Sequence, residues 1–403
     1  MQPLYGLKLL DLTWHVAGPY CTKLLGDFGA EIIKVERPGT GDPARTYGPF
    51  PGDLPDSERS GTFLHLNTNK KSITVNLKTE AGKDIIRDLV RDADVVVESF
   101  SPGVLSRLEL DYAALSEINP GLVMCSISNF GQTGPYRDWK ATNIVLDAMG
   151  GLMTCTGEEG YEPLKSVDHG LEYLAGTTGT TAIMGAVLHK RWNGEGQYID
   201  VSAHEVAAGY PDRRMTALTG YEYTGRISTR EPMLPTALPY GCFPCADGYV
   251  SYTVQPPARW TRFMEMMGRP DLLEDERFKD PGVWSDPATK EEMDAMWFPW
   301  LMEHTKQEAM EEGQKYRLAC AAVNSTAEVL GDRHLAARGF WRKAGHPEAG
   351  ELTYTGPSFH MGEGAWTLRS TAPLLGQHNT EVFTGRLGLS PQEIGVLRSG
   401  DAV

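Results

Sequence analysis

The stretch LKLLDLTWHVAGPYCTKLLGDFGAEIIKVE (residues 7–36) decides the fold class of this chain. Apolar residues dominate segments 7–12 and 31–36, as in strands buried inside a sheet, and residues 20–28 between them have the pattern of a helix. A turn over residues 13–19 joins the first strand to that helix. Two strands linked through a helix by short connections are typical of a βαβ unit, whose strands run parallel.

The next part of the chain repeats this alternation of strand and helix. Further strands are predicted over residues 67–78, 94–97 and 122–127, and an amphipathic helix over residues 80–91. The sequence therefore predicts an α/β fold with a mostly parallel sheet and helices on both faces. In such sheets ligands bind beyond the carboxyl ends of the strands, which is where the sequence places His15, Arg37, Ser99 and Phe100. The GxGxxG turn is absent, so an ordinary dinucleotide-binding site is not predicted.

Residues 210–330 have a different character, with more Met, Trp and Pro. A strand is predicted over residues 249–254, followed by several helices between residues 260 and 314. This segment predicts a smaller α+β domain, preceded by a large domain whose N-terminal part is residues 1–209. A chain of 403 residues is long enough for two such domains.

Composition excludes several classes of function. A net charge of −15 argues against a general nucleic-acid or membrane-surface protein. No run approaches the roughly 18 apolar residues of a membrane span, and no signal peptide is recognisable, so a cytoplasmic location is expected. The six cysteines include Cys242-Phe-Pro-Cys245, but no second pair completes a zinc set. These are interpreted as core or loop thiols, and no metal site is predicted.

The stretch EPLKSVDHGLEYLAGTTGTTAIMGAVLHKRWNGEGQYIDVSAHE (residues 162–205) holds the two carboxylates on which the functional prediction depends. Asp168 and Glu172 are four residues apart at the predicted start of a helix, where they would share one face near free backbone N–H groups. One interpretation is a covalent nucleophile. The other is that Asp168 caps the helix and Glu172 complements its dipole. The small residues that follow predict close helix packing.

Two arginines lie in the loop after the second strand, at Arg37 and Arg45. The planar guanidinium group suits phosphate oxygens, although arginines in loops also occur as solvated side chains. An anionic ligand of this acidic chain would need a local basic pocket of this kind.

Several motifs in the same order along the chain resemble those of the family III CoA-transferases. This group includes formyl-CoA:oxalate and carnitine CoA-transferases and the related α-methylacyl-CoA racemases. The motifs that carry the resemblance are LDLTWHVAGP, GAEIIKVERPGTGDPAR, NKKSITVNLK, ADVVVESFSPGVLSRLELDY, INPGLVMCSISNFGQTGPYRDW and APLLGQHNTEV. The resemblance implies a Rossmann-like large domain built from both chain ends, to which residues 331–403 return, and two subunits interlocked as rings.

The resemblance also implies a site for the CoA thioester substrate, with no tightly bound cofactor. Carried over onto this sequence, that site comprises Val16, Ala17, Arg37, Val75, Asn76, Leu77, Lys78, Ser99, Phe100, Ser101, Arg107, Lys140, Ala141, Thr142 and Asn143. Residues 75–78 are expected to form the strand on the adenine side. The cations in this set suit the CoA phosphates.

In the family an aspartate attacks the acyl-CoA thioester and forms a mixed anhydride and then an enzyme-CoA thioester. Counting from the approach proline and from the Gly-x-Gly turn places Glu172 at that position. Three alternatives stay open: Glu172 is the nucleophile, Asp168 substitutes for it, or the chain is the less active subunit of a heteromer with an Asp-bearing homologue. Glutamate has one methylene more than the aspartate expected at this position, and a reacting carboxylate misplaced by about 1 Å can lower a rate about 100-fold.

The opening Thr-Trp-His-Val-Ala-Gly-Pro is similar to the aromatic-acid branch of the family, which includes succinyl-CoA:benzylsuccinate CoA-transferases. The glycine-rich loop of formyl-CoA transferases is absent between Arg226 and Tyr240, which argues against formate and oxalate. A larger, partly apolar acid is expected as acceptor, with Trp14 and Met233 as candidate lining. The alternative within the family is an acyl-CoA racemase, although its His-Asp order is reversed here in Asp168-His169.

Overall fold

The computed structural model describes residues 1–403 except 159, 210–212, 228–229, 231–237 and 255–257. These residues form two compact units. Unit 1 comprises Met1–Gly157, Glu162–Thr229 and Ala337–Val403, and unit 2 comprises Glu158–Tyr161 and Arg230–Ala336. Among the described helices, none combines the length and the apolar composition that a membrane crossing requires.

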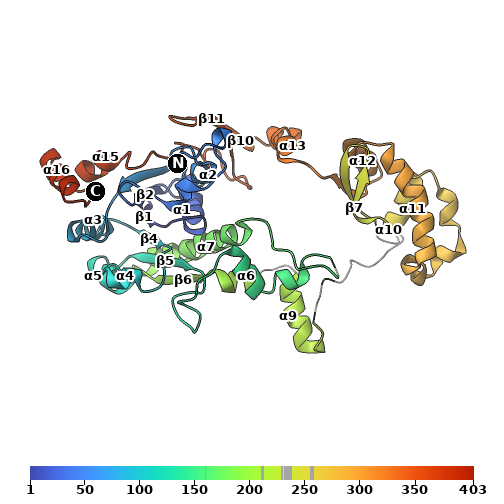
Figure 1. Ribbon diagram of the computed structural model, residues 1–403, viewed down its shortest axis with the longest axis horizontal. Coiled ribbons are helices and arrows are strands. Elements are labelled where there is room, and N and C mark those ends of the chain that lie inside the picture. Colours follow the sequence, from blue (N-terminus) through green and yellow to red (C-terminus); the bar gives the residue numbers. More distant parts are fainter. Residues whose placement is uncertain (159, 210–212, 228–229, 231–237, 255–257) are drawn as a thin grey trace. The chain divides into compact units, whose positions relative to one another are not determined.

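Unit 1 is built on a six-stranded parallel sheet in the order β3-β2-β1-β4-β5-β6 (Figure 1). Its strands are β1 (Lys8–Leu12), β2 (Glu31–Glu36), β3 (Lys70–Thr74), β4 (Val95–Glu98), β5 (Val123–Ser128) and β6 (Tyr198–Ser202). This is the Rossmann order, in which the direction of winding reverses between β1 and β4. The predicted α/β class with a parallel sheet is confirmed.

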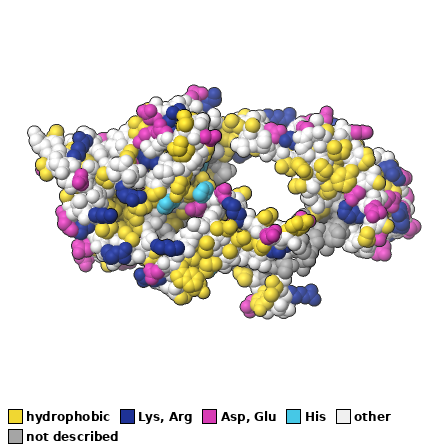
Figure 2. All heavy atoms as spheres, viewed as in Figure 1, with side chains coloured by type: hydrophobic (Ala, Val, Ile, Leu, Met, Phe, Trp, Pro, Cys, Tyr) yellow, Lys and Arg dark blue, Asp and Glu magenta, His cyan; other side chains and the backbone are white. Residues whose placement is uncertain are grey.

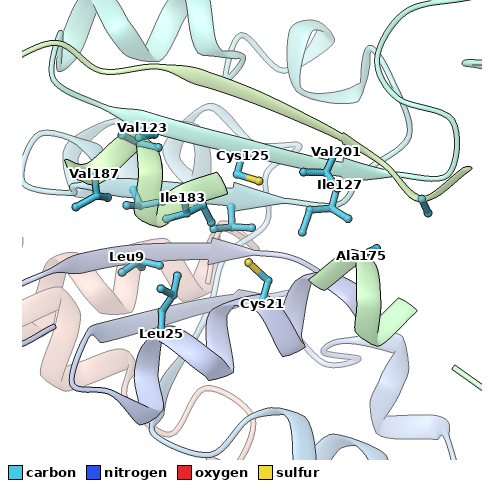
Figure 3. Close-up of a cluster of buried hydrophobic side chains, with 14 of the residues drawn as sticks. Leu9, Cys21, Leu25, Val123, Cys125, Ile127, Ala175, Ile183, Val187 and Val201 are labelled. Atoms are coloured by element: carbon cyan, nitrogen blue, oxygen red, sulfur yellow. The ribbon is translucent and has the colours of Figure 1, made fainter. Parts of the chain in front are cut away.

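Helices cover both faces of this sheet because alternate strand residues point to opposite sides. Leu9 of β1 joins a core with α1 (Ala17–Asp27) and α7 (Gly170–Asn193), and Figure 3 shows side chains of these elements meeting those of β5. Leu10 and Leu12 join the opposite core, with α3 (Glu80–Val90), α5 (Tyr112–Ile118), α15 (Asn379–Gly385) and α16 (Pro391–Ser399).

The C-terminal segment covers the outer strand β3. The backbone N–H of Thr74 donates to Asn379 Oδ1 at 2.8 Å, and that of His378 donates to the Ser72 carbonyl oxygen at 2.9 Å. An edge strand covered in this way has no free row of backbone groups. β3 ends at Thr74, so the prediction that residues 75–78 form a strand is wrong. The N–H of Asn76 instead bonds the carbonyl of Ala402, which draws the chain out of the sheet.

Helix α7 packs closely against α1 because its facing side is free of bulk. A Cβ on Gly176 would lie 2.5 Å from the carbonyl oxygen of Ala17, closer than carbon and oxygen can pack. The predicted close packing of small residues is confirmed at this position. Gly185 differs, because a Cβ there would meet nothing within 4 Å.

Unit 1 contains further regular elements. They are α2 (Gly61–Leu66), α4 (Val104–Arg107), α6 (Asn143–Met149), α8 (Ala203–Ala208), α9 (Arg213–Thr224), the antiparallel pair β10 (Trp341–His346) and β11 (Gly350–Thr355), and 3-10 turns at Pro43–Thr46, Pro51–Asp53 and Met153–Cys155. α14 (Arg333–Ala337) ends at the limit between the units.

Unit 2 has an antiparallel sheet in the order β7-β8-β9, made of Tyr240–Cys245, Gly248–Thr253 and Ala319–Ala322. Its helices are α10 (Ala258–Met266), α11 (Pro287–Met302), α12 (Lys306–Lys315) and α13 (Thr326–Leu330), with 3-10 turns at Pro270–Leu273, Glu276–Lys279 and Pro281–Ser285. Trp297 and Phe263 lie at the centre of its core. None of the six cysteines, all of which lie within the described residues, forms a disulfide; Cys242 is exposed and Cys245 buried, on opposite faces of β7.

Candidate active site

Two cavities open in unit 1 around the carboxyl ends of β1 and β4, where the winding reverses. The larger has a volume of about 730 Å³ and is lined by residues from the ends of β1 and β4, the segment 137–143 and the start of α7. The smaller, of about 370 Å³, is lined by the residues after β1, β2, β3 and β4. Both cavities share the side chains of Trp14, His15, Ser99, Phe100 and Ser101.

Trp14 and Phe100, whose side chains line both cavities, pack against each other. The rings of Trp14 and Phe100 meet edge to face with centroids 4.9 Å apart, and the guanidinium carbon of Arg37 lies 4.2 Å from the Trp14 ring centroid. The N–H of Trp14 donates to Ser99 Oγ at 2.9 Å. A guanidinium group over an aromatic face is an attractive cation–π arrangement that orients the arginine.

Glu98, the last residue of β4, holds the backbone next to these aromatic side chains. Its Oε2 accepts a hydrogen bond from the backbone N–H of Phe100 at 2.7 Å, and the side chain is buried. Burial raises the pKa of Glu98 to about 7, and the negative charge of Asp200 acts in the same direction. A carboxyl group that titrates near neutral pH therefore holds the loop that begins at Ser99.

Cationic side chains gather around the cavities. Arg37 and Lys78 line the smaller cavity, and Arg107, Arg137 and Lys140 line the larger. The Arg107 and Arg137 guanidinium groups converge, because each lies within 4 Å of the position that a Cβ on Gly103 would take. Figure 2 shows Lys and Arg side chains around an area of unit 1 where hydrophobic and histidine side chains meet. Such a basic surface suits a polyanionic ligand.

Arg45 is not part of this basic surface. Its side chain is buried, and its Nε and Nη2 donate to both oxygens of Glu36 at 2.8 and 2.9 Å. Nη1 donates to Glu58 at 2.7 Å, and the guanidinium group also covers the Phe63 ring. The interpretation of Arg45 as a phosphate ligand or a solvated side chain is therefore wrong: it is a structural ion pair.

Glu172 lies in the first turn of α7 and lines the larger cavity. Its side chain is 27% exposed, and Oε2 lies 2.5 Å from Nδ1 of His169. Gly176, one turn later, is the residue that lets α7 approach α1. This contact brings Glu172 beside the start of α1, where backbone N–H groups are free to bind an oxyanion.

Asp168 does not share a helical face with Glu172, so that prediction is wrong. Helix α7 begins at Gly170 and its N-cap is His169, so Asp168 is neither helical nor the cap. Its side chain is 77% exposed and pairs with Lys165. Asp168 is not among the residues that line either cavity.

His15 projects into both cavities from a left-handed backbone conformation with φ of 70°. Its backbone N–H donates to Asp42 Oδ1 at 3.0 Å, and its Nδ1 lies 2.6 Å from the Tyr47 hydroxyl. Asp42 is itself buried and paired with Lys34 at 2.8 Å. Burial raises the pKa of Tyr47, and the negative charges of Asp42 and Glu172 add to this effect.

A buried ionic network holds the turn that carries His15. Lys34 Nζ donates to the carbonyl of Thr13, and Asp11 accepts from the N–H of the same residue. Lys70 Nζ donates to Asp11 and to the carbonyl of Pro19. Burial lowers the pKa of Lys70, to about 8, although Asp11 opposes this effect. The network fixes the turn between β1 and α1.

With this geometry established, comparisons identify the chain. The sequence profile of CoA-transferase family III matches residues 4–379. The chain belongs to CoA-transferase family III. The family transfers CoA between acyl-CoA thioesters and carboxylic acids, so the chain is a CoA-transferase that acts on CoA thioesters.

Known members of CoA-transferase family III match over nearly their whole length. The chain is 34% identical over 428 residues to a formyl-CoA:oxalate CoA-transferase of Streptomyces avermitilis, covering all of both chains. It is 31% identical over 401 residues to a succinyl-CoA–L-malate CoA-transferase beta subunit of Chloroflexus aurantiacus, covering 98% of this chain and 97% of that one. The crystal structure of a CAIB/BAIF family protein from Brucella suis superposes with a TM-score of 0.82 at 29% identity, covering 96% and 99% of the two chains.

The structure brings most of the expected CoA-transferase site together. All of the expected CoA-binding residues except Val16 line one or both cavities. Val16 is buried as the N-cap of α1, directly before Ala17, which does line the larger cavity. The roles assigned to these residues stay predictions. Met233 lies outside the described residues.

Sequence reasoning missed Tyr47, Arg137 and Glu98. Arg137 lies in QTGPYRDW, the end of one of the motifs that carry the family resemblance, so an arginine at this place in a motif could have indicated a ligand-binding cation. Glu98 was visible as an acidic residue that ends an apolar strand, which is unusual because buried carboxylates are rare. Tyr47 gave no local signal, since it reaches the cavity through a loop. In the part of the chain that the structure describes, no cluster of three or more His, Cys, Asp or Glu could hold a metal ion.

Proposed function

We propose that this chain transfers CoA from an acyl-CoA such as succinyl-CoA to a carboxylic acid, with Glu172 as the covalent nucleophile. The observation that carries the proposal is the position of the Glu172 carboxylate in the same cavity as Ala17, Ser99–Ser101 and Arg107. Asp168 is exposed, bound to Lys165 and outside the cavity lining, which makes it a poor substitute.

The reaction then proceeds through four exchanges at acyl carbons. A Glu172 oxygen attacks the thioester carbonyl, the C–S bond breaks, and CoA leaves as a thiolate from a mixed anhydride. The thiolate attacks the glutamyl carbonyl and releases the donor acid, which leaves a glutamyl-CoA thioester. The acceptor carboxylate attacks this thioester, and the released thiolate attacks the acceptor half of the new anhydride. Acceptor-CoA leaves and the Glu172 carboxylate is restored, with no net proton uptake.

The acceptor is a larger, partly apolar acid, as in the benzylsuccinate branch. Support comes from the cavity volume of about 730 Å³ and from the Trp14, Phe100, Trp139 and Leu146 side chains among its lining. Oxalate and malate, in the names of the relatives, are smaller and more polar.

The enzyme works as an interlocked dimer, either of two copies or of this chain with a homologue. A second candidate function is therefore that of a non-catalytic subunit. The glutamate at the nucleophile position favours it, and a relative named as a beta subunit shows that members with distinct subunits are known.

The racemase alternative fits the geometry less well. Inversion by proton transfer needs an acid and a base that reach opposite faces of one carbon. His169 and Glu172 are instead hydrogen-bonded to each other at 2.5 Å, so they present one polar group to the cavity. Incorporation of deuterium at the α-carbon of an acyl-CoA in D₂O, without any acceptor acid, would favour the racemase.

Isotope exchange tests the proposal. The purified chain is incubated with succinyl-CoA and ¹⁴C-succinate, and label in succinyl-CoA is measured. A glutamyl-CoA intermediate predicts exchange without any second acid, which is lost in Glu172→Gln and retained in Asp168→Asn. Absence of exchange in protein that binds CoA would favour the non-catalytic subunit.

A further inference from the structure

His169 has a backbone conformation that residues other than glycine adopt uncommonly. It is the N-cap of α7 with φ of 61° and ψ of 3°, in the left-handed region. Side chains with a Cβ are strained there; glycine is usual, and asparagine, aspartate and histidine are the most common exceptions. The side chain of His169 makes no capping hydrogen bond to the helix. The imidazole therefore gives the helix none of the benefit that Ser, Thr, Asp or Asn gives at this position.

What the imidazole does contact is Glu172. Nδ1 of His169 lies 2.5 Å from Oε2 of Glu172, one helical turn away, and both side chains line the larger cavity. Both are partly shielded from solvent, with exposures of 43% and 27%. Strained backbone conformations that persist at a cavity are associated with functional sites. The strain at His169 is accompanied by this one specific side-chain contact.

The segment before His169 is anchored independently of that contact. The N–H and hydroxyl of Ser166 both donate to Oδ2 of the buried Asp147, at 3.1 and 2.6 Å. The N–H of Gly170 donates to the Val167 carbonyl at 3.1 Å, which closes the turn. The backbone that carries the imidazole is thus held by contacts that do not involve Glu172.

We propose that His169 is a positioning residue that fixes the Glu172 carboxylate for attack. This inference rests on the proposed function of Glu172. The imidazole donates its Nδ1–H to Oε2, which holds one carboxylate oxygen and leaves Oε1 to face the thioester. A glutamate has one more rotatable bond than an aspartate, so its carboxylate needs such a restraint to stay in a reactive position.

The test compares two substitutions that both suit the left-handed backbone. His169→Gly accepts the conformation and removes the donor; His169→Asn accepts it and keeps an N–H donor on a short side chain. Steady-state kcat and the KM for succinyl-CoA are measured for both, with unfolding temperature and CoA binding as checks of the fold. Glu172→Gln is measured alongside.

The expected result is a fall in kcat of about 100-fold for His169→Gly, with the KM for succinyl-CoA within about twofold of the original chain. His169→Asn should recover at least about a tenth of the original kcat. A His169→Gly chain with unchanged kcat, beside an inactive Glu172→Gln, would overturn this inference and leave the proposed function standing. Failure of His169→Asn to recover any activity would also overturn it. An active Glu172→Gln would overturn the proposed function and the inference together.

Discussion

Replacing Glu98 by glutamine should make the chain more stable at neutral pH but not at acidic pH. Glu98 is 4% exposed at the end of β4, and burial raises its pKa from an ordinary value of 4.5 to about 7. Below pH 4.5 the carboxyl is protonated in both the folded and the unfolded chain. Between pH 4.5 and about 7 the unfolded chain loses this proton first, so the free energy of unfolding falls as pH rises.

The size of the effect follows from that pKa difference. At about 1.4 kcal/mol for each pH unit, the range from 4.5 to about 7 corresponds to about 3 kcal/mol. Glutamine has nearly the same shape, does not titrate, and keeps an oxygen that can accept the Phe100 N–H. Glu98→Gln should therefore gain up to about 3 kcal/mol over the original chain between pH 4.5 and pH 8.

The difference in the free energy of unfolding between Glu98→Gln and the original chain is measured by urea unfolding at pH 5, 6, 7 and 8. Unfolding is monitored by tryptophan fluorescence, and the stabilisation that added CoA gives reports on unit 1. Glu98→Ala is the matched control, because it also removes the charge but leaves the N–H of Phe100 without its 2.7 Å partner. It should bind CoA more weakly than Glu98→Gln at every pH. Unfolding midpoints of Glu98→Gln and the original chain that run parallel from pH 5 to 8 would refute the reasoning.

Four further substitutions test the packing and the charges. In thermal unfolding, Gly176→Val should destabilise the chain by about 1–3 kcal/mol, because the larger side chain overpacks against α1. Gly185→Ala is the contrasting change: a Cβ there meets nothing within 4 Å, so it should stabilise the chain by up to about 1 kcal/mol. Arg37→Ala should weaken CoA binding about 10-fold in calorimetry and reduce its sensitivity to salt; an unchanged affinity would remove Arg37 from the site. Burial alone would raise the pKa of Asp11, but Lys70 and a second buried lysine outweigh burial and lower this pKa to about 2. The folded chain should therefore lose about 2 kcal/mol of stability as pH falls from 3.8 to about 2. Asp11→Asn should lack that loss in acid unfolding curves.

Much of the sheet could be predicted because its strands are short apolar runs with period-two or continuous burial. The β2 strand was predicted with the bounds that the structure has, Glu31–Glu36. Errors arose where a long-range contact ends an element. Residues 75–78 look like a strand in the sequence, yet the carbonyl of Ala402, from the far end of the chain, takes the N–H of Asn76.

The site could be predicted in part, through motifs whose residues adjoin strand ends. Which arginine forms an ion pair in the interior could not be predicted from the sequence, because its partners come from other parts of the fold. Arg45 stands beside Arg37 in one loop, but only Arg45 meets Glu36 and Glu58 in the interior. The contacts of His169 with Glu172 and of His15 with Tyr47 depend on two left-handed backbone positions, and such positions remain uncommon even for histidine, so the sequence does not specify them.

The most direct test of the account is to find the atom that carries CoA. The purified chain is mixed with succinyl-CoA, treated with borohydride to reduce a protein-bound thioester to an alcohol, and digested for peptide mass spectrometry. The account predicts the reduced residue at Glu172, and no modified peptide from Glu172→Gln. A modification at Asp168 instead, or an unmodified peptide from chains that bind CoA, would contradict it.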